Sequence, residues 1–96
     1  MSVERSFYLL AYDIANDRRR QKIARLCEAM AERVQESVFE AYLSQAELDK
    51  LLKKIGRVLK KEEDSLRIYL LCASCRSKVR LFGVGKVTPA PGVVII

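Results

Sequence analysis

The 96-residue chain contains no histidine. This absence excludes histidine general bases, histidine nucleophiles and histidine–zinc sites. The chain has only three cysteines, and in a cytoplasmic protein these are favoured as thiols over disulfides. If the protein catalyses a hydrolysis, a water activated by a metal ion is therefore the plausible nucleophile.

Long hydrophobic runs are also missing. No segment approaches the ~20 apolar residues that a membrane-spanning helix needs, and residues 1–5 lead into a strand-like run with no signal-peptide cleavage site. We therefore expect a cytoplasmic protein without a membrane partner. Half of the residues are hydrophobic, which argues against disorder. The length gives one domain with a marginal core, which a second subunit would stabilise.

The charge is positive and unevenly distributed. Eighteen Lys and Arg residues oppose twelve Asp and Glu residues, for a net charge of +6. The cations cluster at residues 18–25, 50–61 and 76–86. An even distribution would indicate solubility alone, whereas clustering favours a polyanionic partner such as nucleic acid.

Hydrophobic periodicity predicts alternating strands and helices. Residues 33–43 form either one strand or two strands with a tight turn near Glu36-Ser37. Ser44 and Glu47 form a capping box at a helix start, and either Asn16 or Asp17 caps the first helix. The predicted elements are a strand at 6–14, a helix at 18–31, strand structure at 33–43, a helix from 45 to about 61, strands at 65–73 and 79–83, a linker at 88–92 and a last apolar run at 93–96.

This pattern predicts an α+β sandwich with both helices on one face of a sheet. The first strand is apolar on both faces, with Phe7, Leu9 and Ala11 on the face away from Tyr8 and Leu10. A second copy of the chain is the simplest cover for the free face. Residues 1–83 form the domain, and residues 84–96 form a linker and a strand. This strand either joins the sheet of the partner protomer or closes its own sheet.

Asp13 ends the first strand, directly before a basic helix start. A carboxylate at this position beside arginines can hold a divalent cation against a phosphate. The alternative is that Asp13 caps the following helix, which is a common role for a carboxylate at a strand end.

Three stretches together resemble a known family. They are Tyr12-Asp13-Ile14 with Asp17-Arg18-Arg19-Arg20, then Glu32-Arg33-Val34-Gln35-Glu36-Ser37-Val38-Phe39-Glu40, and Asp64-Ser65-Leu66-Arg67-Ile68-Tyr69 with Cys72-Ala73-Ser74-Cys75. The chain resembles the second core CRISPR-associated protein, a small metal-dependent endonuclease that works beside the CRISPR adaptation integrase. The likeness covers nearly the whole chain in the same order.

The resemblance implies a ferredoxin-like βαββαβ fold, two protomers packed sheet to sheet, and a carboxyl-terminal strand shared across the homodimer. It implies that Asp13 is the catalytic residue that binds Mg²⁺ or another divalent ion, supported by Tyr12. The implied function is hydrolysis of phosphodiester bonds in single-stranded RNA or in DNA, during spacer acquisition and antiviral defence. The alternatives are a non-catalytic DNA-binding scaffold for the integrase and a regulatory dimer that binds a small ligand.

Further residues follow from the same comparison. Arg20, Lys22 and Arg33 match nucleic-acid-binding positions, although Lys22 lacks the two-pronged donor geometry of arginine. Arg19 belongs to the same basic cluster and is also expected to contact phosphate.

Other motifs favour structural roles. Phe39 is expected in the core or at the dimer interface. Ser37 has no nearby base and is interpreted as a hydrogen-bonding turn or strand residue. Cys72-x-x-Cys75 lacks the other ligands of a zinc site, so we interpret it as a structural pair or an incidental disulfide rather than a metal or redox site.

Overall fold

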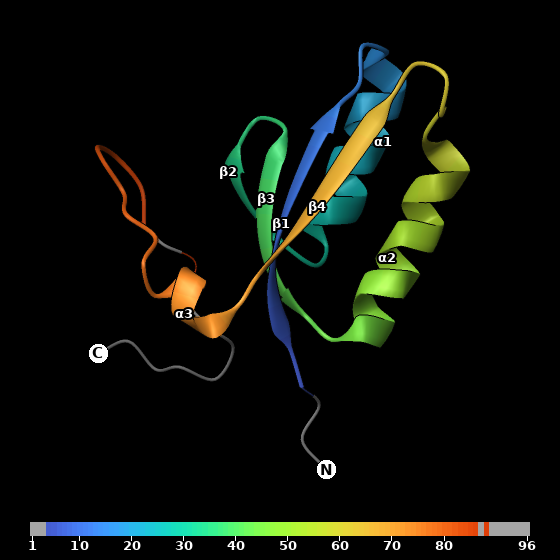
Figure 1. The fold of residues 1–96 in the computed structure, drawn as a ribbon. Coiled ribbons are helices and arrows are strands. Elements are labelled where there is room, and N and C mark those ends of the chain that lie inside the picture. Colours follow the sequence, from blue (N-terminus) through green and yellow to red (C-terminus); the bar gives the residue numbers. More distant parts are fainter. Residues whose placement is uncertain (1–3, 87, 89–96) are drawn as a thin grey trace.

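A computed structural model describes residues 4–86 and residue 88, and it shows one antiparallel sheet with two helices packed on one face (Figure 1). The elements follow the order βαββαβ and end with a short helix. The ferredoxin-like sandwich expected from the sequence is therefore confirmed. The elements are β1 (Ser6–Asp13), α1 (Asp17–Glu28), β2 (Glu32–Gln35), β3 (Val38–Leu43), α2 (Gln45–Val58), β4 (Ser65–Leu71) and α3 (Ala73–Arg76).

The first strand lies in the middle of the sheet. The strand order is β2-β3-β1-β4, and β1 pairs antiparallel with β3 on one side and β4 on the other. Leu9, for example, lies opposite Glu40 of β3 and Tyr69 of β4. This central position places β1 in the apolar core, which explains its long apolar run.

The core fills the space between the sheet and the two long helices. Leu10 of β1, Ile23 of α1 and Leu51 of α2 are each fully buried there. Leu10 lies on the face of β1 that alternates toward the helices, and Ile23 and Leu51 lie on the apolar stripes of α1 and α2. The side chains of β1 that face the helices are those of Tyr8, Leu10 and Tyr12, followed by Ile14 just beyond the strand.

The helix starts follow the capping rules. The side chain of Asn16 accepts a hydrogen bond from the backbone N–H of Arg19 at 3.0 Å, so Asn16 rather than Asp17 caps α1. The predicted capping box of α2 is confirmed, because Ser44 Oγ accepts from the Glu47 N–H at 3.1 Å while a Glu47 carboxylate oxygen accepts from the Ser44 N–H at 2.8 Å.

Residues 33–43 form two strands rather than one. β2 and β3 pair as an antiparallel hairpin whose turn is Glu36-Ser37. The pairing register shifts between Arg33 and Gln35. The two-strand alternative is therefore confirmed, although neither Gly nor Pro marks the turn.

Two predictions beyond β4 are wrong. Leu71 lies opposite Phe7, near the start of β1 at Ser6, so residues 72 and 73 have little strand left to pair with. The chain turns into α3 instead. Residues 79–83 form no strand. The chain bends around residues 83–85, with positive φ angles of 93° at Gly83 and 132° at Gly85, which glycine adopts without a Cβ clash.

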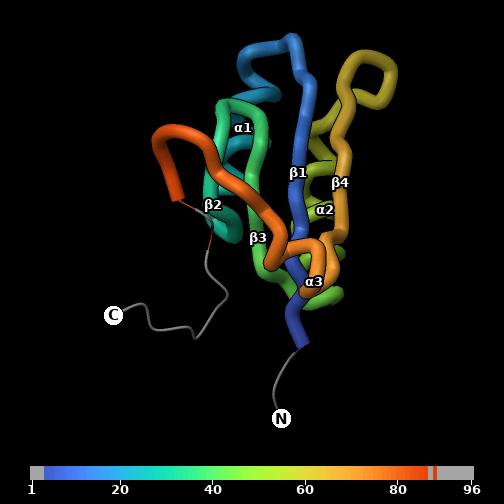
Figure 2. Tube along the Cα trace, turned by 60° about the vertical axis from the view of Figure 1, so that its left-hand side comes forward, coloured from blue at the N-terminus to red at the C-terminus, as the bar shows by residue number. Residues whose placement is uncertain are grey.

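The second face of the sheet carries no long helix. Instead, α3 and the residues after it pass along part of this face (Figure 2). Arg76 lies over the rings of Phe7 and Tyr42, at 5.0 and 5.9 Å from their centroids, and the Thr88 hydroxyl donates to Glu40 at 2.7 Å. This side of the sheet, which carries the side chains of Phe7, Leu9 and Ala11, is the open face.

Part of the open face and one sheet edge remain apolar and exposed. Tyr69 is 48% exposed on the open face, and Leu70 is 62% exposed on the edge strand β4. No helix in the described part of the chain is long and apolar enough to cross a bilayer. The run at 93–96, predicted to join a partner's sheet, lies outside the described residues.

Candidate active site at the end of the first strand

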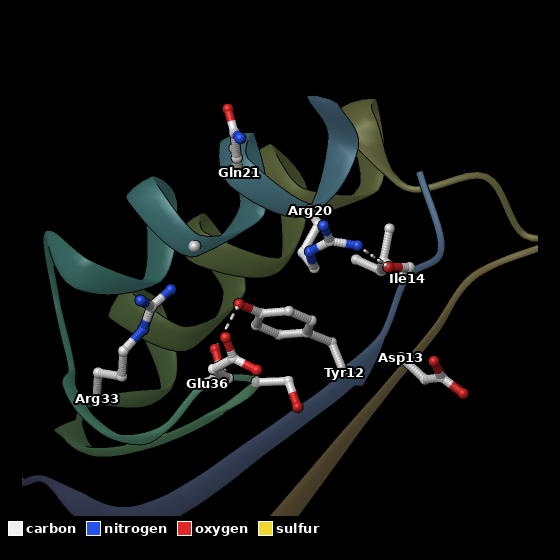
Figure 3. Close-up of a pocket in the computed structure, with 9 residues that line it drawn as sticks. Tyr12, Asp13, Ile14, Arg20, Gln21, Arg33 and Glu36 are labelled. Carbon is white, nitrogen blue, oxygen red and sulfur yellow. Dashed lines mark hydrogen bonds between the residues drawn. The ribbon is translucent and has the colours of Figure 1, made fainter. Parts of the chain in front are cut away.

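The carboxylate of Asp13 lies at the end of β1 on the open face. Asp13 pairs with Ser65 of β4, and the alternation of a strand places its side chain on the same face as those of Leu9 and Ala11. The residue is exposed, and its carboxylate points away from the helix side of the sheet (Figure 3). The capping alternative for Asp13 is wrong, because Asn16 caps α1. The carboxylate is therefore available to a ligand.

A divalent ion at Asp13 would need further ligands. Within residues 4–86 and 88, no three His, Cys, Asp or Glu side chains lie close enough to form a metal cluster. Magnesium binds through one or two carboxylates and takes its remaining oxygens from water and substrate phosphate. An exposed strand-end carboxylate fits this pattern when a second carboxylate or a phosphate completes the set.

An open pocket of about 420 Å³ lies on the other side of β1, next to α1. The side chain of Tyr12 lies between those of Arg20 and Arg33 in this region (Figure 3). The pocket brings together four of the predicted site residues and adds five residues that the sequence analysis did not assign to the site. Its lining residues are Tyr12, Asp13, Ile14, Arg20, Gln21, Ala24, Arg33, Glu36 and Ser37.

Tyr12 positions the hairpin turn. It is only 5% exposed, and its ring stacks on that of Phe39 with centroids 6.2 Å apart. Its hydroxyl donates to the backbone carbonyl of Glu36 at 3.2 Å, and its backbone N–H donates to the carbonyl of Ser37 at 3.0 Å. These contacts tie the end of β1 to the turn, so Tyr12 supports the site rather than contacting an external ligand through a free hydroxyl.

Arg20 closes the loop between β1 and α1. Its guanidinium donates to the carbonyl oxygens of Ile14 at 3.1 Å and Ala15 at 3.3 Å, and it pairs with the Asp17 carboxylate. The side chain still remains 43% exposed. Arg20 can therefore both hold the loop that follows Asp13 and present positive charge to the pocket.

Arg33 approaches the same pocket from β2. Its guanidinium lies 5.3 Å from the centroid of the Phe39 ring and 3.5 Å from the carboxylate of Glu28. Phe39 itself is fully buried in the core, so it has no exposed surface for stacking on a base. Arg33 is 43% exposed and is the least constrained arginine of the pocket, with a single long ion pair.

Arg19 points elsewhere and is held within the fold. It donates to both carboxylate oxygens of Asp64, at 2.7 and 3.1 Å, and to Glu63 at 2.8 Å. The hydrogen bonds from Arg19 are the main cause of the lowered pKa of Asp64. The Asp64 side chain is shielded from solvent and also accepts from the backbone N–H of Lys60 at 2.8 Å. The ion pair joins α1 to the loop before β4, so Arg19 has few donors left for phosphate.

Lys22 is likewise separate from the pocket. Together with Arg25 and Lys54 it borders a different hollow of about 310 Å³ between α1 and α2. The structure therefore distributes the predicted basic residues over three places. Only Arg20 and Arg33 lie beside the end of β1.

Glu36 and Gln21 are two of the pocket residues that the sequence analysis did not assign to the site. Glu36 contributes through its backbone carbonyl, which any residue type could supply. Gln21 follows Arg20 on α1 and lines the pocket from above the Tyr12 ring (Figure 3). Neither residue carries a sequence signal that distinguishes it from an ordinary exposed polar residue.

Comparisons with known proteins agree with this architecture. The family model described as CRISPR associated protein Cas2 matches residues 6–79. The CRISPR-associated endoribonuclease Cas2 1 of Chloroflexus aurantiacus is 51% identical over 80 residues, which cover 82% of this chain and 86% of the relative. The CRISPR-associated endoribonuclease Cas2 3 of a Synechocystis species is 44% identical over 89 residues, covering 93% and 97%.

Solved structures show the same likeness. The hypothetical protein TT1823 from Thermus thermophilus superimposes with a TM-score of 0.77 at 41% identity, covering 85% of this chain and 95% of that one. Cas2 from Streptococcus pyogenes gives 0.72 at 29% identity, covering 80% and 99%. A chain from a partial Cas6-RT-Cas1--Cas2 complex gives 0.74 at 26% identity, covering 95% and 99%.

Proposed function

Because this chain belongs to the Cas2 family of CRISPR-associated proteins, we propose that it is an endonuclease that acts in CRISPR spacer acquisition and antiviral defence. The reaction is hydrolysis of phosphodiester bonds in single-stranded RNA or in DNA. The relatives named above as endoribonucleases support this activity, as does a Cas2 endonuclease of Thermus thermophilus that is 44% identical. One structural observation supports the proposal most directly. The carboxylate of Asp13 is exposed at the end of β1 and does not cap α1.

Magnesium is the proposed cofactor, and Asp13 of each of two copies would hold it. When bound, the ion offsets negative charge on the phosphodiester and orients the attacking water. The chain's own residues do the rest of the positioning. Tyr12 fixes the hairpin turn, Arg20 fixes the loop after Asp13, and Arg33 attracts phosphate beside the strand end.

The surfaces left uncovered support a homodimer. The chain is short for a self-sufficient core, and Tyr69 on the open face together with Leu70 on β4 leaves apolar area in water. An unprotected edge strand is a template for pairing with another chain. We propose that two copies pack through their open faces and that residues 93–96 add to the partner's sheet edge.

A second role is favoured by the partial Cas6-RT-Cas1--Cas2 complex, one of whose chains resembles this protein. We propose that the chain also binds the CRISPR integrase and DNA as a scaffold. The cations along α1 and α2 would then contact DNA backbone, and affinity would fall steeply with salt. Both roles place the protein in the cytoplasm.

The Asp13→Asn variant tests the nuclease and separates the two roles. We expect cleavage of labelled single-stranded RNA or duplex DNA in Mg²⁺ to fall roughly 100-fold, equivalent to a barrier increase of about 2.7 kcal/mol. The matched control is Asp49→Asn, an exposed carboxylate on α2 that accepts a hydrogen bond only from Gln45 among the described residues.

The control should cleave like the parent, and chelation of Mg²⁺ should reproduce the effect of Asp13→Asn. Equal cleavage by parent and Asp13→Asn would show that Asp13 is not catalytic. If Asp13→Asn loses cleavage but supports spacer integration, the scaffold role is the main one.

A further inference from the structure

Cys72 and Cys75 lie at the end of the sheet opposite Asp13. β4 runs from Ser65, which pairs with Asp13, to Leu71, which pairs with Phe7. The two ends are six residue steps apart along the strand, a distance of roughly 20 Å. Both cysteines are free thiols and both are exposed. Neither the nuclease nor the scaffold role uses them, and exposure also argues against the structural role that the sequence suggested.

The backbone places the two cysteines one turn apart at the start of α3. Cys72 is the cap residue of α3, in an extended conformation with φ of −68° and ψ of 166°, and Cys75 follows one helical turn later. This is the spacing of a Cys-x-x-Cys motif at the start of a helix. The Cys72 sulfur is also 3.3 Å from the Ser74 hydroxyl oxygen.

The surroundings shift the pKa values of the two thiols in opposite directions. The hydrogen bond with the Ser74 hydroxyl, followed by the neighbouring Cys75, lowers the pKa of Cys72 to about 7. A hydrogen bond with the Cys72 side chain raises the pKa of Cys75. The lowered pKa favours the thiolate of Cys72, which is the reactive form of cysteine. Cys27 is the opposite case, because it is fully buried and burial raises its pKa to about 11.

In the single protomer, a small molecule can reach Cys72. The residue lines an open pocket of about 740 Å³, the largest of the pockets described, together with Phe7, Tyr42, Leu71 and Arg76. This volume is within the range of small-molecule sites. The pocket is separate from the one beside Tyr12, so a reagent bound here would not occupy the nuclease site.

We propose that Cys72 and Cys75 form a redox-active dithiol that reacts with low-molecular-weight disulfides such as oxidised glutathione. The Cys72 thiolate attacks one sulfur of the disulfide, which forms a mixed disulfide and releases one glutathione thiolate that takes up a proton. Cys75 then loses its proton to water and attacks the Cys72 sulfur, which releases the second glutathione. Two protein thiols are oxidised to one disulfide, and one glutathione disulfide is reduced to two thiols.

The test treats the full-length protein with oxidised glutathione at pH 7 and maps its disulfides by mass spectrometry. The expected product is a Cys72–Cys75 disulfide with Cys27 unmodified, and dithiothreitol should reverse it. Cys75→Ser should instead accumulate glutathione on Cys72, because the second attack is lost. Cys72→Ser should react at least ~10-fold more slowly than Cys75→Ser, since it lacks the activated thiol.

Alkylation rates add an independent readout. In native protein, alkylation of Cys72 by iodoacetamide should rise with a midpoint near pH 7. The proposal is overturned if Cys72 reacts no faster than in urea-unfolded chain, or if glutathione remains on Cys72 of the parent without bridging to Cys75. Circular dichroism checks that both serine variants fold. None of these readouts uses nucleic-acid cleavage, so their failure would leave the proposed nuclease untouched.

Discussion

Tyr12 and Asp13 are consecutive residues whose side chains lie on opposite faces of β1 (Figure 3). The tyrosine is buried under the helices, where it holds the hairpin turn, and the carboxylate is exposed on the open face. Asp13 borders the arginine pocket at the end of β1, while its carboxylate projects toward the open face. A nucleic acid that contacts the carboxylate and the pocket must therefore lie across the end of β1, where Arg20 and Arg33 supply positive charge.

Tyr12→Phe tests the positioning role. The change removes the hydrogen bond to the Glu36 carbonyl but keeps the ring that stacks on Phe39. We expect the free energy of unfolding to fall by about 1 kcal/mol, measured by urea denaturation, with cleavage reduced but not abolished. The matched control is Tyr42→Phe, whose hydroxyl forms no hydrogen bond with the described residues, and it should leave stability nearly unchanged. Complete loss of cleavage in a stably folded Tyr12→Phe would indicate direct participation in the reaction.

Arg19→Ala tests whether Arg19 stabilises the fold. The sequence analysis predicted instead that Arg19 contacts phosphate. Removing the guanidinium leaves the shielded Asp64 carboxylate without its ion partner. We expect the melting temperature to fall by roughly 5 °C or more, against about 1 °C for the exposed neighbour Arg18→Ala. Differential scanning calorimetry measures both. A negligible shift for Arg19→Ala, accompanied by weaker nucleic-acid binding, would restore the phosphate-binding interpretation.

Acid should destabilise the protein through Glu47 and Asp64. Hydrogen bonds from the Ser44 backbone, and then from Arg5, lower the pKa of Glu47 to about 2, and Arg19 lowers that of Asp64. Both carboxyl groups therefore bind protons less readily in the folded chain than in the unfolded one. Their stabilisation is complete above the unfolded values near pH 4, and it is lost as the pH falls through the folded values.

The Glu47→Gln variant isolates the contribution of Glu47. Glutamine can still accept from the Ser44 N–H but does not titrate. The melting temperature of Glu47→Gln should therefore fall less steeply than that of the parent between roughly pH 4.5 and pH 2.5. Parallel curves for the two proteins would show that Glu47 does not contribute to acid unfolding.

Local sequence patterns were sufficient for most of the fold. The capping box at Ser44 and the apolar stripe of α2 depend on neighbours three and four residues away, which are visible in sequence. The end of β4 could not be predicted in this way. The sequence is as compatible with a strand at residues 72 and 73 as it is at Leu66 to Leu71. The strand ends at Leu71 because β1 has almost no residues left to pair with the next two.

The sequence nominates candidate site residues but not their arrangement. Asp13 and the nearby arginines are recognisable from the run that begins at Tyr12. Which arginine faces the pocket depends on contacts across 45 residues of sequence, such as that of Arg19 with Asp64. No local pattern indicates such a pair. The separation of Tyr12 and Asp13, in contrast, follows directly from strand alternation.

Tyr69→Glu tests the proposed dimer. Tyr69 is 48% exposed on the open face of the protomer, so a charge there should not disturb the monomer fold, but it would be costly inside an apolar subunit contact. We expect the dimer dissociation constant to rise at least ~10-fold, measured by analytical ultracentrifugation. Lys50→Glu, an exposed change on α2, should leave association unchanged. Equal association of parent and Tyr69→Glu would place the contact elsewhere.

The proposed mechanism needs Asp13 from each of two protomers for one cleavage event. Co-refolded mixtures of parent and Asp13→Asn test it directly, through the cleavage rate as a function of the mixing ratio. If both carboxylates are required, an equimolar mixture should retain about a quarter of the parental rate, because only dimers with two parental protomers cleave. A rate that falls in proportion to the parental fraction, to about half in the same mixture, would contradict the shared site.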